Sequence, residues 1–397
     1  MLKQNTSSIP SQCFGQHYTD VSVASVLTKL LGVRNPETVI DLGVGEGSLL
    51  MGANALWSNA RLHGIDIDQA SLDLARRQLG KGTFGHADCL AAALPLNIRK
   101  LFSTADVVLC NPPFLELSHP FAKQSLTQDW RLTAEVKFLE ISLELLRLGG
   151  SLGIILPARY VSGPSYREFR RQLVSKCNVV SVTHLPTSTF KTAEVDAHFL
   201  VLRKESPVGA ISLQSLGETG QLGEAIPLAT DSAEERMDFQ YYSGLAHWTS
   251  NAVPLSLLLT QDVCRGVVSR GRATAPNIFH TTDFKRYPDG LVTVPVHNIH
   301  HKTGLAIQGD ILIPRVGYRS LHHCVQVTEG EFTYSDCVYR LRVVPEWQAY
   351  VFQYLRSAAG VEIRKRSAHG SCVKILGKQT LLDLPVPMVA PSQLESL

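Results

Sequence analysis

The chain has 397 residues, of which 44% are hydrophobic and 18% are charged, and its 38 lysines and arginines accompany 35 aspartates and glutamates. A chain of this length predicts two domains, or three, each large enough to bury its own core. The composition excludes a disordered chain, a collagen-like repeat and a coiled-coil rod. The formal net charge of +3, taken as a total, favours a small-molecule enzyme over a nucleic-acid-binding protein.

The sequence predicts neither secretion nor membrane insertion. Residues 1–8 lack the charged and apolar regions of a signal peptide, and no run approaches the roughly 18 apolar residues that a membrane span needs. The 8 cysteines include no C-x-x-C pair, which argues against a disulfide framework and a zinc knuckle. We therefore expect a cytoplasmic protein.

From Glu37 onward, short apolar runs alternate with longer amphipathic segments, which is typical of βα units on a mostly parallel sheet. Thr133 and Ser165 are candidate caps of two helices, and Gly149-Gly150 is expected to end the first of these two. The predicted strands are residues 38–42, 62–67, 107–110, 151–156, 179–184 and 199–203. The predicted helices are residues 47–55, 69–79, 135–146 and 166–176.

Residues 205–239 differ from the segments on either side. Their apolar periodicity fades, and seven acids accompany a single base, Arg236. We predict a linker or a peripheral meander here, between a first domain of residues 1–204 and a second of residues 240–397. Short strand-like pieces such as residues 309–314 and 337–343 predict an α+β second domain.

Charge is unevenly distributed among these three segments. Residues 1–204 carry a net charge of +4, residues 205–239 of −6 and residues 240–397 of +5. The bases of the last segment cluster, which favours contact with phosphate groups. The clustered bases are Arg265, Arg270, Arg272, Arg315, Arg319, Arg364, Lys365 and Arg366.

A glycine-rich turn follows the first predicted strand, where residues 41–47 read Asp-Leu-Gly-Val-Gly-Glu-Gly. The glycines permit a sharp turn and a close approach of the backbone to a ligand, and the following helix start supplies free amide donors. Asp66 lies at the end of the next predicted strand, where it can accept hydrogen bonds from ribose hydroxyls, and Asp88 is expected to follow a further strand. The pattern predicts a site for a nucleoside-bearing cofactor, with Asp41, Gly43, Gly45, Gly47, Asp66, Ile67 and Asp88 as its residues.

Two classes of nucleotide site compete for this pattern. A dinucleotide-binding loop reads G-x-G-x-x-G, whereas this chain has G-x-G-x-G with an acid before it. The whole arrangement resembles the class I S-adenosylmethionine-dependent methyltransferases. The resemblance implies an α/β fold with a Rossmann-like sheet flanked by helices. It also implies S-adenosylmethionine as cofactor, with the glycine loop beside the methionine moiety, Asp66 on the ribose and Asp88 on the adenine.

The predicted strand 107–110 ends in Asn111-Pro112-Pro113-Phe114. Two consecutive prolines fix φ and remove two amide donors, so the carbonyl groups here are held rigidly and cannot pair as sheet. The Asn111 carboxamide and the Pro112 carbonyl can accept both hydrogens of an amino group on a ring. This grip favours a pyramidal nitrogen, whose lone pair then points toward a sulfonium methyl. The tetrapeptide therefore predicts methyl transfer to an exocyclic amine, with Phe114 stacked on the flat substrate.

This tetrapeptide resembles the motif of methyltransferases that act on adenine N6, on guanine N2 of ribosomal RNA or on a protein glutamine, and it does not separate these substrates. The surrounding sequence resembles the gamma-class adenine-N6 DNA methyltransferases. Residues 14–19 are similar to the segment ahead of the cofactor loop, usually Tyr-Thr-Pro, with Asp20 in place of the proline. This resemblance implies that Thr19 contacts the cofactor. Residues 185–191 are similar to the last motif of the class, which implies that Phe190 stacks on the flipped base.

Residues 262–267, 309–313 and 370–387 resemble the target-recognition domains of type I restriction specificity subunits, in the order found in that family. The resemblance implies one DNA target-recognition domain in residues 240–397. It implies double-stranded DNA as the partner of a self-contained modification enzyme, and it allows a cognate restriction nuclease on a separate chain.

The sequence is therefore interpreted as a site-specific DNA methyltransferase that transfers a methyl group from S-adenosylmethionine to N6 of a flipped-out adenine, in a restriction-modification or related defence system. The alternatives are an RNA guanine-N2 methyltransferase and a DNA-binding specificity protein with an inactive methyltransferase lobe. No metal is expected, because transfer from a sulfonium needs none and the histidines between His297 and His323 match no zinc spacing. Asn111, Pro112, Phe114 and Phe190 are the predicted catalytic residues. Asn111 is also predicted at the cofactor, and Pro113 and the clustered bases at the substrate.

Overall fold

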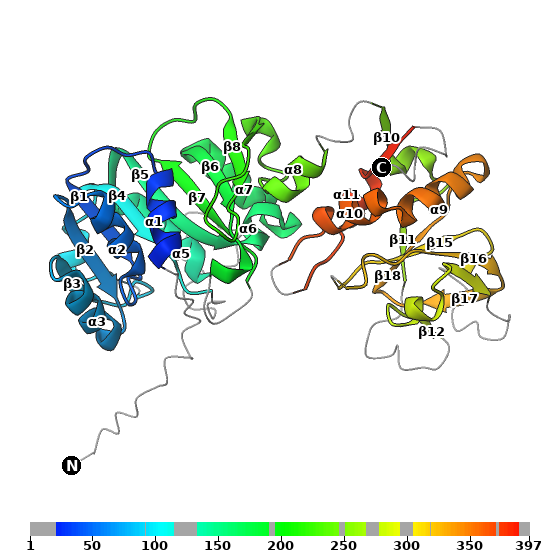
Figure 1. The fold of residues 1–397 in the computed structure, drawn as a ribbon, viewed down its shortest axis with the longest axis horizontal. Coiled ribbons are helices and arrows are strands. Elements are labelled where there is room, and N and C mark those ends of the chain that lie inside the picture. Colours follow the sequence, from blue (N-terminus) through cyan, green and yellow to red (C-terminus); the bar gives the residue numbers. More distant parts are fainter. Residues whose placement is uncertain are drawn as a thin grey trace, which may run out of the picture. The chain divides into compact units, whose positions relative to one another are not determined.

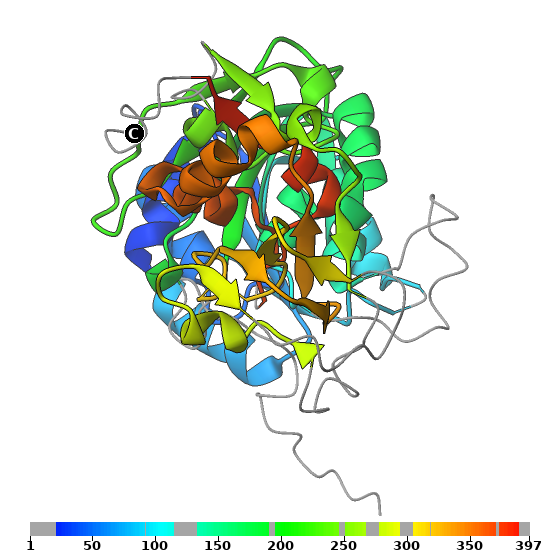
Figure 2. The same ribbon diagram turned by 90° about the vertical axis from the view of Figure 1, so that its right-hand side faces the viewer.

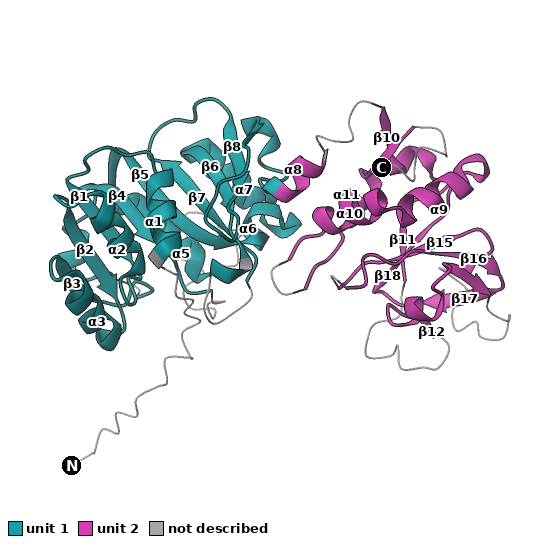
Figure 3. Cartoon of the chain, viewed as in Figure 1, with its two compact units in different colours: residues 1–239 teal, residues 240–397 magenta. Residues whose placement is uncertain are grey.

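The computed structural model describes residues 21–91, 93–114, 133–189, 195–245, 251–266, 278–293, 305–317, 319–370 and 373–388. The chain divides into two compact units, residues 1–239 and residues 240–397 (Figure 3). No helix in the described ranges is both long enough and apolar enough to cross a bilayer.

Unit 1 is built on a nine-stranded sheet with the order β3-β2-β1-β4-β5-β7-β6-β8-β9 (Figure 1). The strands from β3 to β5 run parallel to one another, and β7 lies antiparallel between β5 and β6. Its strands are β1 (Thr38–Leu42), β2 (Arg61–Asp66), β3 (Thr83–His86), β4 (Ala105–Cys110), β5 (Leu146–Pro157), β6 (Asn178–His184), β7 (Ala197–Arg203), β8 (Ile211–Ser215) and β9 (Ile226–Leu228).

Helices cover both faces of this sheet (Figure 1). On one face α1 packs against α2, and α2 packs against α3, while α5 contacts β4 and β5 and α7 contacts β6. The central strands are buried on both faces, so β1 is apolar at both Val39 and Ile40 instead of alternating. The helices are α1 (Val21–Leu30), α2 (Ser48–Leu56), α3 (Gln69–Leu79), α4 (Leu96–Arg99), α5 (Ala134–Leu145), α6 (Ala158–Ser162) and α7 (Arg167–Lys176).

The predicted helices and strands of residues 38–203 are all present, and the helix over Gln69–Leu79 and the strand over Thr38–Leu42 have the predicted bounds. Thr133 caps α5 by accepting from the Val136 amide at 3.4 Å. Two details are wrong. Ser165 does not cap α7, because it lies in a 3-10 turn, Pro164–Tyr166, that precedes the helix.

The second wrong detail concerns Gly149-Gly150, which does not end α5. The helix stops at Leu145, and the chain continues directly as β5. Gly149, at φ 73°, lies inside this strand, where its amide donates to the Lys204 carbonyl at 3.0 Å. The glycine pair therefore lies in an irregular part of β5, where Gly149 adopts a left-handed backbone conformation that suits glycine.

The acidic segment 205–239, for which the sequence predicts a linker or a peripheral meander, belongs to unit 1. Its strand β8 pairs in parallel with β6, and β9 pairs antiparallel with β8, so the segment extends the edge of the main sheet. Arg236, its single base, is buried in a two-contact ion pair with Asp238 at 2.8 Å.

Unit 2 contains a five-stranded sheet with the order β11-β18-β15-β16-β13, a three-stranded sheet β12-β17-β14 and a pair β10-β19. Its strands are β10 (Ala252–Pro254), β11 (Cys264–Arg265), β12 (Ile278–Phe279), β13 (Leu291–Thr293), β14 (Ala306–Ile307), β15 (Ile311–Pro314), β16 (Val325–Glu329), β17 (Glu331–Tyr334), β18 (Val338–Leu341) and β19 (Pro385–Pro387). Its helices are α9 (Gln348–Arg356), α10 (Ala358–Ser367) and α11 (Lys378–Leu382), and α8 (Phe239–Leu245) begins at the boundary between the units.

The central strand β15 separates two cores of unit 2. Ile311 and Ile313 pack into one core with residues of α9 and α10, whereas Leu312 between them packs into the other with residues of β12, β16 and β17. This division follows from the two-residue period of a strand. In both views the orange helices α9 and α10 lie together on one side of the yellow and orange strands (Figures 1 and 2).

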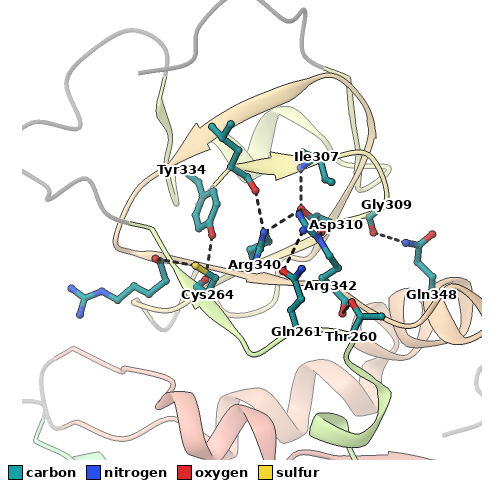
Figure 4. A network of polar contacts seen from close by, with 12 residues as sticks. Thr260, Gln261, Cys264, Ile307, Gly309, Asp310, Tyr334, Arg340, Arg342 and Gln348 are labelled. Carbon is teal, nitrogen blue, oxygen red and sulfur yellow. Dashed lines mark hydrogen bonds and ion pairs between the residues drawn. The ribbon is translucent and has the colours of Figure 1, made fainter. Parts of the chain in front are cut away.

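A buried polar network holds the strands of unit 2 at one end of the five-stranded sheet (Figure 4). Asp310, only 1% exposed, accepts two hydrogen bonds from Arg342 at 2.7 and 2.8 Å and lies 4.0 Å from Arg340. Its other contact is the Ile307 amide at 2.9 Å. The two arginines also share Gln261. The aspartate therefore connects β14, β15 and β18.

Candidate cofactor and amine-binding site

The candidate site lies at the carboxyl ends of β1 and β4. These neighbouring parallel strands pair Leu42 with Cys110, so the glycine loop and Asn111 leave the sheet side by side. The sequence leads from β1 outward to β2 and β3 on one side, and from β4 to β5 on the other. Such a reversal of strand order opens a crevice outside the carboxyl ends of the strands, where open α/β sheets bind ligands.

The glycine loop needs its glycines. Gly43, Gly45 and Gly47 have φ values of 80°, 49° and 91°, in the left-handed region that suits residues without a side chain. A Cβ on Gly43 would lie 3.1 Å from the Phe138 ring of α5. A Cβ on Gly47 would lie 3.1 Å from Ala75 of α3. Gly43 thus allows the loop to lie close to α5, and Gly47 allows the start of α2 to lie close to α3.

Asp66, at the end of β2, holds the glycine loop by its side chain. Its Oδ2 accepts from the Gly45 amide at 2.7 Å, and its Oδ1 accepts from the Asp68 amide at 2.9 Å. The side chain is 6% exposed, and burial raises its pKa above the ordinary value, although the backbone amides of Asp68 and Gly45 act in the opposite direction. Asp68 itself caps α3 through Ala70 and Ser71.

Asp41, in β1 just before the glycine loop, is a buried acid that a positively charged ligand would compensate. It is 1% exposed, and its Oδ1 is buried with no hydrogen-bond partner among the described residues. Burial, and then the nearby charge of Asp66, raise its pKa well above the ordinary value. Two buried acids beside a loop of glycines fit a ligand that carries positive charge and hydroxyl donors, because such a ligand would compensate both.

The other predicted cofactor residues follow β2 and β3 at the same edge. Ile67 is exposed, at 41%, and its carbonyl lies 2.7 Å from the His86 ring. Asp88 is exposed, and its Oδ1 accepts from the Leu90 amide at 2.8 Å. An exposed aliphatic side chain and an exposed carboxylate on adjacent strand ends suit the faces and edge of an adenine ring. Thr19, the remaining predicted cofactor residue, lies outside the described residues.

Asn111-Pro112-Pro113-Phe114 directly follows β4, as predicted. Asn111 is half-buried, and its carbonyl lies 3.8 Å from the position of a Cβ on Gly43. Phe114 is half-buried and packs against the unit 1 core. The structure thus brings the tetrapeptide next to the glycine loop. Phe190, the predicted second stacking ring, lies outside the described residues.

A buried ion pair borders this edge, and sequence reasoning missed it. Glu135, in the first turn of α5, is fully buried and pairs with Arg159, which directly follows β5. Burial raises the pKa of Glu135, against the effect of Arg159. The signal was present in the sequence, because an acid in a first helical turn and an arginine after a strand end both fall at the carboxyl edge of a parallel sheet.

The clustered bases of unit 2 divide into different kinds. The prediction that Arg364 contacts the substrate is wrong, because its side chain is fully buried and donates to the carbonyl groups of Gly360, His323 and Leu355. Arg265 pairs with Asp336 at 2.8 Å, and Arg315 donates to the carbonyl of the same residue. Arg366 is paired with Glu362, whereas Arg319 and Lys365 line a common pocket. Arg270 and Arg272 lie outside the described residues.

One group of side chains among those described offers three atoms typical of metal ligands within 4.8 Å of one another: His184, Asp196 and His198. His184 lies 3.2 Å from Asp196, so the two already form an ion pair when the imidazole is protonated. None of them belongs to the C-terminal histidines weighed from the sequence. The expectation that no metal takes part stays a prediction.

Strand order, glycine loop and the acids at successive strand ends together define a class I methyltransferase fold. A family model described as N-6 DNA Methylase matches residues 1–221, more than half of the chain. The chain belongs to this family, and the family implies an S-adenosylmethionine-type methyl donor.

The relatives of the chain fall into two groups by name. Over 106 residues it is 33% identical to the "Putative type II restriction enzyme and methyltransferase RM.MjaORFECS2P" of Methanocaldococcus jannaschii, which covers 26% of this chain and 9% of that protein. Over 117 residues it is 38% identical to "Ribosomal RNA large subunit methyltransferase G" of Shewanella oneidensis, which covers 28% and 29%. The chain thus spans less than a third of these relatives.

Among solved structures, the type IIG restriction endonuclease BpuSI is similar to this chain with a TM-score of 0.52 at 15% identity. The similarity covers 96% of this chain and 60% of that one. At this identity it concerns the fold alone.

Proposed function

We propose that the protein is an adenine-specific DNA methyltransferase that transfers a methyl group from S-adenosylmethionine to adenine N6, within a restriction-modification or related defence system. The observation that carries the proposal is the adjacency of the glycine loop and Asn111 at the ends of β1 and β4. Membership of the N-6 DNA methylase family supports the choice of adenine in DNA.

In this proposal the two buried acids and the loop hold the cofactor. Asp66 accepts from the ribose hydroxyls, and the buried Oδ1 of Asp41 favours the positive charge of the methionine end. Ile67 and Asp88 contact the adenine from the ends of β2 and β3. S-adenosylmethionine supplies, when bound, a methyl group on a positively charged sulfur.

The tetrapeptide prepares the substrate amine. Asn111 and the Pro112 carbonyl accept the two N6 hydrogens, which makes the nitrogen lone pair available, and Phe114 stacks on the base. The target adenine must leave the helix, because its amino group is paired and cannot approach a cofactor inside the duplex. Phe190 is the proposed second ring. Pro113 and the clustered bases of unit 2, other than the buried Arg364, are proposed to contact the DNA.

Asn111→Ala tests the proposal directly. We expect methyl transfer to a mixed-sequence duplex to fall by at least about 10³-fold, because the amine loses an acceptor that acts in the transition state. Binding of the duplex should change by less than about threefold. The measurement is transfer of labelled methyl groups, followed by nucleoside analysis. Full activity in this variant would sink the assignment.

A ribosomal RNA substrate is the second candidate, and the similarity to ribosomal RNA large subunit methyltransferase G favours it. The two candidates share cofactor and tetrapeptide but differ in product. N6-methyladenine formed in duplex DNA supports the first, whereas N2-methylguanosine formed in ribosomal RNA would replace it by the second.

A further inference from the structure

A pocket in unit 2 gathers basic side chains from three separate segments. Lys285 comes from the 3-10 turn η7 (Asp283–Arg286), Lys365 comes from α10, and the remaining three groups come from the turn that precedes β16. Phe284 and Pro288 also line it. The basic residues of the pocket are Lys285, Arg319, His322, His323 and Lys365.

No acidic side chain lines this pocket in the described part of the chain. The nearest acids of the same elements are engaged elsewhere: Asp283 pairs with Arg286 at 3.0 Å, and Glu362 pairs with Arg366 at 2.8 Å. Within the described ranges Lys285 and Arg319 form no ion pair, and both are exposed. The pocket is therefore a concentration of positive charge with room for an anion.

The pocket is built rigidly around this charge. Arg364, fully buried beneath it, donates to the His323 carbonyl at 2.8 Å and so fixes the turn to α10. The rings of His322 and His323 lie 3.8 Å apart, and His323 is stacked near Phe284. The Nε2 of His323 is buried and has no hydrogen-bond partner in the described structure. A site that keeps like charges together without an acid is expected to bind an anion.

We propose that Lys285, Arg319, His322, His323 and Lys365 form a binding site for a backbone phosphate of duplex DNA. The assignment rests on the proposed function for the identity of the polymer, and on the pocket itself for the phosphate. Charge distribution supports unit 2 as the DNA-attracting part, because residues 240–397 carry a net charge of +5 whereas residues 1–239 hold 22 bases and 24 acids.

The site couples phosphate binding to protonation. Burial and then Lys365 lower the pKa of His322, and burial and then His322 lower the pKa of His323, with Lys285 and the buried Arg364 acting in the same direction on both. A phosphate in the pocket reverses the charge effect, so the histidines take up protons when DNA binds. DNA affinity should therefore rise as the pH falls below about 6.5, the ordinary histidine pKa.

The experiment is the salt dependence of binding to a fluorescent duplex of mixed sequence, since phosphate contacts dominate binding without sequence preference. For Lys365→Gln and for Arg319→Gln we expect the slope of log affinity against log salt to fall by roughly 0.9, the value for one lost phosphate contact. The matched control is Arg286→Gln, a neighbouring exposed cation that is already paired with Asp283 and does not line the pocket. Its slope should remain that of the wild type.

A double variant, His322→Gln with His323→Gln, tests the coupling. It should bind DNA with the same affinity at pH 5.5 and pH 7.5, whereas the wild type binds more tightly at pH 5.5. Unchanged slopes in both pocket variants, or equal losses in the Arg286→Gln control, would overturn the site. So would an effect confined to inorganic phosphate or to single-stranded RNA.

These outcomes separate the site from the proposed function. If the wild type forms N6-methyladenine and the pocket variants retain its salt slope, only the phosphate site fails. If the wild type binds no duplex and methylates none, the proposed function fails first.

Discussion

Asp66 shows how one side chain can organise the nucleotide end of the site. Its two oxygens accept hydrogen bonds from the amides of Gly45 in the glycine loop and of Asp68, which caps α3. A carboxylate that is already held by backbone amides keeps a fixed direction, so its remaining lone pairs are presented to a ligand without further ordering. The residue therefore holds the loop and, in the proposed function, also binds the cofactor.

Asp66→Ala should weaken S-adenosylmethionine binding by about 10-fold to 100-fold, because two backbone amides and the ribose hydroxyls lose their acceptor. Titration calorimetry measures this change. Asp73→Ala is the control, since Asp73 is a half-exposed acid of α3 that contacts its helix neighbours Gln69 and Arg76. Wild-type affinity in Asp66→Ala would remove the residue from the cofactor site.

The raised pKa of Asp66 adds a pH dependence to that result. Burial is its main cause, so the carboxylate becomes protonated at a higher pH than an exposed aspartate, whose pKa is about 3.9. Cofactor affinity should therefore begin to fall at a pH above the ordinary aspartate pKa, because the protonated acid is a poorer acceptor. The effect on folding has the opposite sign: the folded state binds the proton more readily than the unfolded state, so this group makes stability rise as the pH falls.

The sequence reveals these residues because they are local to strand ends. The parallel sheet places the acids at the ends of β1 and β2 and the acid after β3 at one edge, whatever the details of packing. Arg364 could not be judged in this way. Its neighbours Lys365 and Arg366 in the sequence are equally basic, and only the packing of α9 against α10 decides which of the three is buried.

At the scale of secondary-structure elements, β15 and β18 carry the stability of unit 2. Both strands are apolar throughout, except where Arg340 joins the network around Asp310 (Figure 4). The buried carboxylate of Asp310 has lost its hydration, and its contacts with Arg340 and Arg342 compensate this loss only while both arginines remain. The network therefore fixes which strands lie together, and replacing one of its members is expected to cost unit 2 much of its stability.

Asp310→Asn should destabilise unit 2 by roughly 3 kcal/mol, because it leaves Arg342 and Arg340 in a largely buried site without a negative charge. The midpoint of thermal unfolding measures the loss. Asp262→Asn is the matched control: it breaks a solvent-screened pair with Lys378 on the surface, so its midpoint should stay close to that of the wild type. Similar midpoints for the two variants would contradict the role of the network.

The basic pocket of unit 2 could not be predicted from the sequence, because its side chains come from three segments that are far apart in the chain. Arg319 and Lys365 were found as members of charge clusters, but Lys285 and His323 join them only because η7, the turn before β16 and α10 meet. The acidic segment 205–239 is a similar case. Its faded periodicity resembles a linker, yet short edge strands need only a few apolar residues to pair, and β8 and β9 have them at Ile211, Leu213 and Leu228.

At the scale of the whole molecule, the division of charge changes once the edge strands are counted with unit 1. The negative segment cancels the basic excess of residues 1–204, so the net positive charge of the chain is concentrated in residues 240–397, where the proposed DNA contacts lie. The candidate cofactor and amine-binding site thus lies in unit 1, whereas the net positive charge lies in unit 2. Each unit also buries its own hydrophobic residues, between Ala24 and Leu216 in unit 1 and, in two clusters, between Leu255 and Val386 in unit 2.

Because the two units share no core among the described residues, we predict two separable unfolding transitions in a calorimetric scan of the full chain. S-adenosylmethionine at about 100 times its dissociation constant should stabilise unit 1 by about 2.7 kcal/mol, which raises its midpoint by roughly 5 to 10 °C and leaves the other transition in place. Asp310→Asn should lower only the transition that the cofactor does not move. Because the two perturbations act on different cores, a single transition that responds to both would show that the units unfold as one body.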